Sequence, residues 1–194
     1  MSDIFDQLQS HPQNDSPSRQ FAEDLHTRIA AIEQGEDPTP EWHLAQLNLG
    51  LFAAPLDAPE MEPFVAGLDR INALAEQSPG FVWRLTDEGG APSSYVEVPG
   101  TDDPLMASNL TVWEDLESLW GFMYRTDHVS YLRRRAEWFQ HVDVPMTVGW
   151  WIPAGSLPTL ANAVERLEHL RQHGATDIGF PLGKTIPDPP TIEI

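Results

Sequence analysis

The sequence has no cysteine, and only 11 of its 194 residues are lysine or arginine, against 30 aspartates and glutamates. Without cysteine there can be no disulfide, thiolate metal site or thiol nucleophile. The net charge of −19 argues against nucleic acid and anionic lipid, which attract clustered basic residues. No apolar run approaches the ~20 residues that span a bilayer, and no signal peptide is recognisable. We therefore expect no nucleic-acid or membrane partner and a cytoplasmic location.

The chain divides into three parts. With 41% hydrophobic residues, it can bury a core of its own. Residues 21–34 carry apolar side chains at helical spacing, and a linker rich in acid and proline follows at 36–40. We predict an acidic N-terminal extension with one amphipathic helix over residues 1–40, a main domain over 41–182 and a C-terminal tail over 183–194.

The main domain alternates strand-like and helix-like segments, and a short extra strand is expected at 95–98 within a long connection. Strand patterns cover 42–50, 81–85, 106–113 and 146–153. Helical patterns cover 64–75, 116–123, 127–139 and 160–173. This order predicts an α+β fold of the ferredoxin-like, split βαβ type, with a four-stranded antiparallel sheet and its helices on one face.

The fourth strand pattern bears on the oligomeric state. Met146, Val148, Trp150 and Ile152 alternate with Thr147, Gly149 and Trp151, so both faces of the strand are largely apolar. If the helices cover one face, something else must cover the other. A second copy of the chain would do so by closing two sheets into a barrel, and we expect a homodimer.

Four blocks of sequence resemble a known family. They are HLAQLNLG at 43–50, SPGFVWRL at 78–85, NLTVWEDLESLWGFMYRTDHVSYLRRRAEWF at 109–139 and WWIPAGSLPTLANAVERLEHLRQHG at 150–174. Over about residues 42–180 the chain resembles the bacterial family called domain of unknown function 3291. That family is grouped with the dimeric α/β barrels, which include the antibiotic-biosynthesis monooxygenases. The resemblance implies a dimeric α/β barrel fold.

The resemblance also suggests a catalytic set. Asn109, Trp113 and Tyr124 are similar to the Asn, Trp and Tyr of cofactor-independent monooxygenases, and His128 follows them. A phenolic substrate must lose a proton before it passes an electron to O2, and a buried amide or indole N–H stabilises the resulting oxyanion. Asn109 and Trp113 would bind the reacting oxygen, and His128, oriented by Asp127, would be the base.

Each of these residues also fits a purely structural role. Asn109 fits an ordinary polar position on a strand, and Trp113 fits the core. His128 fits the first turn of a helix capped by Thr126 or Asp127.

We expect substrate contacts from Trp83, Arg84, Tyr124 and Trp150. The tryptophans could line a cavity for an aromatic ring. Arg84 could bind a carboxylate or phenolate, or it could form a plain salt bridge at the surface or in a dimer. The expected ligand is a small hydrophobic or aromatic molecule, with no bound cofactor and no metal.

Three functions follow from these features. The first is a monooxygenase-like oxidoreductase without a cofactor, acting on a hydrophobic phenol or quinol. The second is a non-catalytic ligand-binding or dimer-scaffold protein. The third is a haem-binding barrel, with His128 or His43 as axial ligand. His169 and His173 have a spacing that could chelate a metal, but we find no third ligand and expect coincidence.

Overall fold

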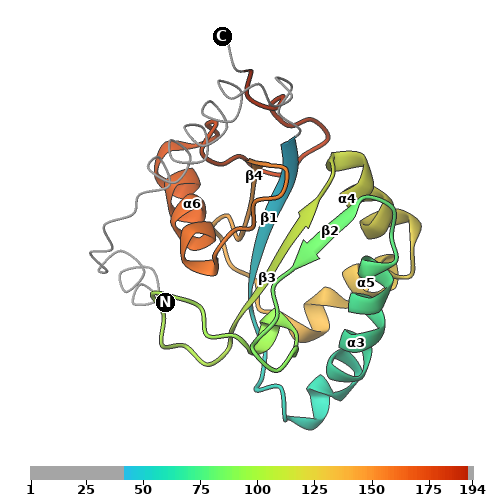
Figure 1. The fold of residues 1–194 in the computed structure, drawn as a ribbon. Coiled ribbons are helices and arrows are strands. Elements are labelled where there is room, and N and C mark those ends of the chain that lie inside the picture. The colour runs from blue at the N-terminus through green and yellow to red at the C-terminus, as the bar shows by residue number, and fades with distance from the viewer. Residues whose placement is uncertain (1–41, 192–194) are drawn as a thin grey trace.

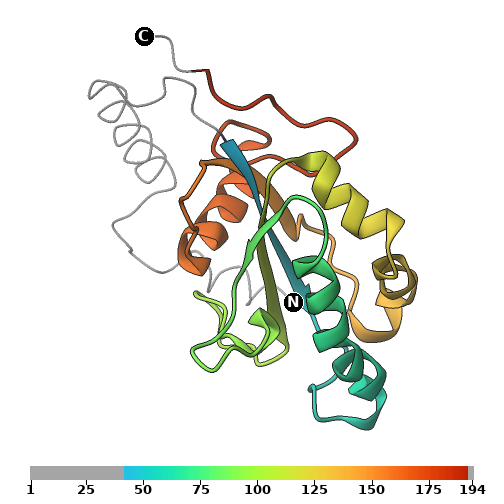
Figure 2. The ribbon, with the colours of Figure 1, turned by 45° about the vertical axis from the view of Figure 1, so that its right-hand side comes forward.

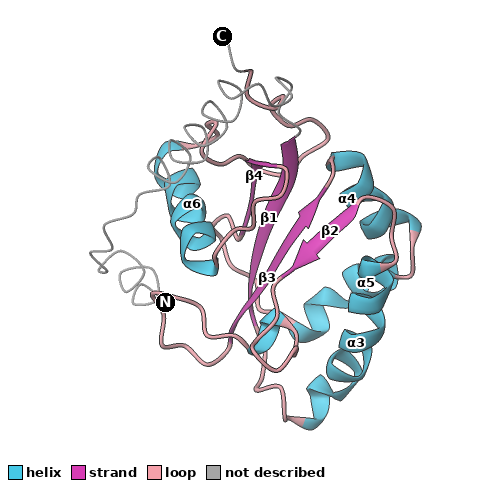
Figure 3. Ribbon diagram, viewed as in Figure 1, coloured by secondary structure: helices cyan, strands magenta, loops and turns pink. Residues whose placement is uncertain are grey.

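The computed structural model describes residues 42–191, so the predicted extension over 1–40 and its helix lie outside the described residues. Within them, a four-stranded antiparallel sheet and four α-helices form a mixed α+β fold (Figures 1 and 3). In chain order the elements are β1 (Trp42–Leu51), η1 (Pro59–Met61), α3 (Glu62–Glu76), β2 (Phe81–Arg84), η2 (Ser93–Tyr95), β3 (Met106–Trp113), α4 (Leu116–Arg125), α5 (His128–Trp138), β4 (Thr147–Pro153) and α6 (Leu160–His173).

The sheet has the strand order β2-β3-β1-β4, and every neighbouring pair is antiparallel. β1 and β2 are joined through α3 and have β3 between them. β3 and β4 are joined through α4 and α5 and have β1 between them. Two β-α-β units are therefore each split by a strand of the other, and the predicted antiparallel four-stranded sheet is confirmed.

Local sequence signals fix the helix ends. Pro63 lies in the first turn of α3, where its missing N–H costs no helical hydrogen bond. The Asp115 carboxylate accepts a hydrogen bond from the backbone N–H of Ser118 and caps α4. Thr159 caps α6 in the same way, and Gly174 ends that helix with a φ of 75°, which favours glycine. The predicted helix boundaries hold within a few residues for this reason.

The strand predicted at 95–98 is wrong. A short 3-10 helix, η2, occupies Ser93–Tyr95 instead. Ser93 Oγ donates to the carbonyl oxygen of Ser108 at 2.8 Å, and Ser108 Oγ donates to the carbonyl oxygen of Ser93 at 3.1 Å. This reciprocal pair is buried and ties the loop to β3, so the segment satisfies its polar groups without joining the sheet.

Helices lie on both faces of the sheet, which corrects the prediction that they share one. α6, orange in Figure 1, lies on one side of the strands and α3, α4 and α5 lie on the other, as Figure 2 also shows. On the α6 face, Leu47, Val148 and Trp150 pack against α6 residues such as Leu167. On the α3–α5 face, Trp113 packs with residues of α4 and with Ala75 of α3.

The second cover explains why both faces of β4 are apolar. Leu47 and Trp150 on the α6 face are 0% exposed within a single chain. On the opposite face, Trp151 packs with Phe180, Leu182 and residues of α4. Each face of β4 thus has a cover from its own chain, and neither face needs a second copy to exclude water.

The C-terminal segment packs back onto the domain beyond the predicted boundary at 182. The Phe180 backbone pairs with that of Gly149 on the outer edge of β4, at N···O distances of 2.8 and 2.9 Å. Ile186 packs against the cluster of the α3–α5 face, and Trp151 Nε1 donates to the carbonyl oxygen of Pro187 at 2.9 Å. The segment therefore contributes to the core as well as to the edge.

Two helical glycines allow a test of the α3–α5 contact. A Cβ on Gly67 of α3 would lie 1.7 Å from the Tyr131 hydroxyl oxygen, whereas a Cβ on Gly121 of α4 would meet nothing within 4 Å. We expect Gly67→Ala to lower the free energy of unfolding by about 1–3 kcal/mol, because Tyr131 of α5 must move. Gly121→Ala should raise it by roughly 0.5–1 kcal/mol, the usual effect in a helix. Urea unfolding followed by circular dichroism measures both, and equal effects would contradict the close helix contact.

Candidate functional site

A row of polar side chains crosses the middle of the α3–α5 face. Asn109 of β3 lies directly opposite Asn48 of β1, and Asn48 neighbours Thr147 of β4. Thr147 Oγ1 donates to Asn48 Oδ1 at 2.9 Å. Both asparagines are exposed although the strand residues beside them are buried. Water therefore reaches two amides near the centre of the sheet, between the two apolar clusters of this face.

Trp113, the predicted partner of Asn109, is in the core. It is 0% exposed, its ring stacks on Phe122, and the edge of Phe81 meets it. Its indole Nε1 donates to Thr111 Oγ1 at 3.0 Å. A substrate oxygen would have to replace Thr111 to receive this hydrogen bond.

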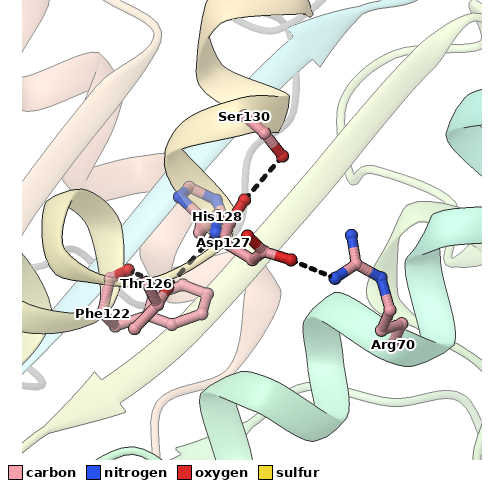
Figure 4. A network of polar contacts seen from close by, with 6 residues as sticks. All are labelled: Arg70, Phe122, Thr126, Asp127, His128 and Ser130. Atoms are coloured by element: carbon pink, nitrogen blue, oxygen red, sulfur yellow. Dashed lines mark hydrogen bonds and ion pairs between the residues drawn. The ribbon is translucent and has the colours of Figure 1, made fainter.

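His128 is the first residue of α5 and is half-buried against α4 (Figure 4). Its ring centroid lies 4.5 Å from that of Phe122, and its Nδ1 lies 3.4 Å from the carbonyl oxygen of Met123. Its backbone N–H donates to Thr126 Oγ1 at 3.2 Å, so Thr126 caps this helix. His128 therefore has the structural role predicted as the alternative, in the first turn of a capped helix.

The proposed orientation of His128 by Asp127 is wrong. The Asp127 carboxylate instead accepts a hydrogen bond from Arg70 Nη1 of α3 at 2.6 Å, and Figure 4 shows it pointing away from the imidazole. This ion pair is exposed, so water screens it, and its main effect is to link α3 to α5. Burial lowers the pKa of His128, and the hydrogen bond to Met123 opposes this shift more weakly. The ring is consequently neutral at physiological pH.

Two further predicted contacts lie at the edges of the α3–α5 face. Tyr124 is 57% exposed at the end of α4, with its ring against Trp120. Arg84 of β2 donates from Nε to the Glu76 carboxylate at the end of α3 at 2.7 Å, and its Nη1 is buried without a hydrogen-bond partner among the described residues. Within the described chain, no hydrogen bond or ion pair joins either residue to Asn109.

The remaining two predicted contacts lie on the opposite face. Trp83 packs at the margin of the α6 cluster, and Trp150 lies in its centre. The structure therefore divides the seven predicted site residues between two faces of one sheet. Asn109, Trp113 and Arg84 belong to the α3–α5 face, Tyr124 and His128 belong to its helices, and Trp83 and Trp150 belong to the α6 face.

Trp150 forms part of a hollow between β4 and the first turns of α6. The hollow measures about 130 Å³. Its lining residues come from the end of β4, the turn that follows and α6: Trp150, Ile152, Ser156, Leu157, Pro158, Thr159, Asn162 and Arg166. Leu157 is 56% exposed and marks the rim, while Trp150 is fully buried and forms part of the floor. We call this space the β4–α6 hollow.

Arg166 gives the hollow its charge. The side chain is 1% exposed, and its guanidinium carbon lies 5.3 Å from the centre of the Trp150 ring. Nε donates to Asn162 Oδ1 at 2.8 Å, and Nη1 donates to the carbonyl oxygen of Ile178 at 2.7 Å. These contacts, one within α6 and one to the C-terminal segment, hold the guanidinium against the indole. Sequence analysis missed Arg166, because an arginine at helical spacing looks like a solvated residue.

Two buried nitrogens on the α6 face have no hydrogen-bond partner among residues 42–191. They are Nε1 of Trp150 and Nδ1 of His43. His43 of β1 lies opposite Ile152, a residue of the hollow, and Trp150 lies opposite Ala45. A buried polar atom without a partner costs about 1–3 kcal/mol and is a common mark of a place that takes a ligand or water.

The paired histidines of α6 have a structural contact. The His169 and His173 rings lie 4.5 Å apart, and His169 Nε2 is 3.1 Å from Thr176 Oγ1. No group of three or more potential metal ligands occurs within residues 42–191.

The chain matches one family model. The model described as Domain of unknown function (DUF3291) covers residues 43–193. The chain belongs to this family. No curated protein and no solved structure matches it. The DUF3291 match spans both faces of the sheet and α6, so the β4–α6 hollow and the Asn48–Asn109 pair both lie within the family domain. Among residues 42–191 no helix is both long and apolar enough to cross a membrane.

The low pKa of His128 predicts a pH-dependent stability. An unfolded chain binds this proton near pH 6.5, whereas the folded protein binds it only at lower pH. The free energy of unfolding should therefore decrease as the pH falls from about 6.5 to the pKa of the folded state. His128→Phe keeps a ring against Phe122 and should remove this part of the decrease. Denaturant unfolding from pH 7 to pH 5 measures it, with the exposed His141→Gln as control. A variant with the slope of the wild type would contradict the assignment.

Proposed function

We propose that this DUF3291 protein binds a small hydrophobic or aromatic molecule in the β4–α6 hollow. The observation that carries the proposal is the hollow itself, floored by a buried tryptophan whose N–H has no partner among the described residues. Pockets for small molecules are mostly apolar with a few polar groups, and this one combines Trp150, Ile152 and Leu157 with Asn162 and Arg166.

The volume limits the ligand. A cavity of roughly 150 Å³ holds one benzene molecule, so a hollow of about 130 Å³ suits a single ring with a small substituent. Haem is far larger, and the residues of this hollow do not fit it.

The test is to fill the hollow. Ser156 is half-buried on its lining, and Ala161 is exposed on α6 outside it. Single-ring compounds should raise the melting temperature and quench tryptophan fluorescence in the wild type. Ser156→Phe should weaken binding at least ten-fold because its ring takes the ligand's space, whereas Ala161→Phe should retain it. Equal binding by both variants would place the ligand elsewhere, and no binding by any ring compound would refute the proposal.

A second proposal is a cofactor-independent oxygenase centred on Asn109. It is favoured by one observation, the exposed Asn48–Asn109 pair on the α3–α5 face, because an exposed amide can hold a substrate oxygen. His128, neutral at physiological pH, has the protonation state that a base needs. Trp113 would enter this chemistry only by giving up Thr111.

Oxygen consumption tests the oxygenase proposal. Hydroxynaphthoquinones and anthrones are suitable phenolic substrates, and turnover should fall at least ten-fold in Asn109→Ala. Gln77→Ala removes an exposed amide outside the sheet and should leave turnover unchanged. If no compound is turned over, or if Asn109→Ala matches the wild type, the protein is not this kind of oxygenase.

The ferredoxin-like dimeric α/β barrel remains a proposal with a specific requirement. The split β-α-β order of the sheet supports the ferredoxin-like assignment. Barrel closure by a second copy would place its sheet against Leu47 and Trp150, which α6 already covers. A homodimer of this type therefore requires α6 to leave that face. The sequence argument for a second copy was an uncovered sheet face, and α6 covers that face.

A further inference from the structure

We propose that the ligand of the β4–α6 hollow carries a carboxylate, so that the site selects small aromatic acids over neutral rings of the same size. This inference rests on the proposed function, because it names the chemical class of a ligand for that hollow. It depends on which hydrogen-bonding groups line the hollow and lie beside it.

Two residues that line the hollow, Arg166 and Trp150, carry only hydrogen-bond donors, whereas Ser156, Thr159 and Asn162 also carry acceptors. Arg166 carries a permanent positive charge and has only N–H groups to offer, and the indole of Trp150 has a single N–H. Neither can hydrogen-bond to a ligand donor. A carboxylate supplies two strong acceptors and a negative charge, and guanidinium–carboxylate pairs are among the strongest hydrogen-bonded pairs in proteins.

The position of Arg166 suits such a pair. Its charge lies over the Trp150 ring and is held there by Asn162 and Ile178. Arg166 has further interactions besides these, and a ligand carboxylate would bind beside them. A cation that is 1% exposed attracts an anion much more strongly than one in water, because little solvent screens it.

The N-terminal end of α6 also favours a negatively charged ligand. Thr159 caps this 14-residue helix, and both Thr159 and Asn162 of its first turn line the hollow. The N-terminal end of a helix has a partial positive charge and stabilises anions. The helix end would not define a site alone, but here it joins the buried guanidinium and the unpartnered indole N–H of Trp150.

His43 adds a nitrogen that can pair with either a hydrogen-bond donor or an acceptor of the ligand. It lies opposite Ile152 in the β1–β4 ladder, and its buried Nδ1 has no partner in the described part of the chain. An imidazole nitrogen can donate or accept according to its tautomer. His43 is therefore a polar neighbour of Ile152, one of the residues that line the hollow.

A pair of matched ligands tests the charge preference on the full-length wild-type protein. Benzoate and benzyl alcohol have the same ring and nearly the same size, and only benzoate carries a charge. We expect benzoate to bind at least ten-fold more tightly in calorimetry at low ionic strength. Equal affinities would overturn the carboxylate inference while leaving small-molecule binding intact. If neither compound nor any other ring compound binds, the proposed function fails as well.

Variants then locate the charge. Arg166→Met keeps much of the side-chain volume and should abolish the preference for benzoate over benzyl alcohol. Arg171→Met removes a charge from the same helix outside the hollow and should keep the preference for benzoate. A preference that survives Arg166→Met would assign the charge to another group and overturn the role of Arg166. If Arg166→Met does not fold, the comparison of the two ligands on the wild type still decides the inference.

Discussion

The structure depends on a sheet that carries apolar side chains on both of its faces. β1 and β4 each contribute side chains to the α6 cluster and to the opposite cluster. An apolar face in water is unfavourable in proportion to its area, so each face must be covered. One chain does this with α6 on one side and with α3, α4, α5 and the C-terminal segment on the other. The β4–α6 hollow lies between the sheet and one of these covers, and the exposed Asn48–Asn109 pair lies where the other cover leaves access to water.

The helices and strands were largely predictable from the sequence, but the face of the sheet that each helix covers was not. Caps and stops such as Asp115, Thr159 and Gly174 act within a few residues, and the sequence therefore places the helices closely. Which face a terminal helix covers depends on contacts far apart in the chain. The alternation of Val148, Trp150 and Ile152 with Trp151 showed that two covers were needed, but it could not show that α6 was one of them. The same alternation fits a second copy of the chain equally well.

For the candidate site, too, the sequence predicted local features better than contacts between residues far apart in the chain. Period-two alternation along β3 puts Asn109 on the same side as Trp113 and away from Leu110, and the two apolar clusters agree with it. It could not show that Trp113 Nε1 is bonded to Thr111, or that Asp127 is bonded to Arg70. Arg166 was missed because its burial depends on the C-terminal segment, whose Ile178 carbonyl accepts its hydrogen bond. The Arg70 and Ile178 partners are chosen by tertiary packing.

The two edges of the sheet affect how readily one molecule can form β-pairing with another. β2 is an outer strand of only four residues, with an irregular register against β3. The outer side of β4 is partly occupied by the pairing of Gly149 with Phe180. Long, flat outer strands promote intermolecular β-sheet growth and aggregation. The short strand at one edge and the Gly149–Phe180 β-bridge at the other leave few backbone groups available for such growth.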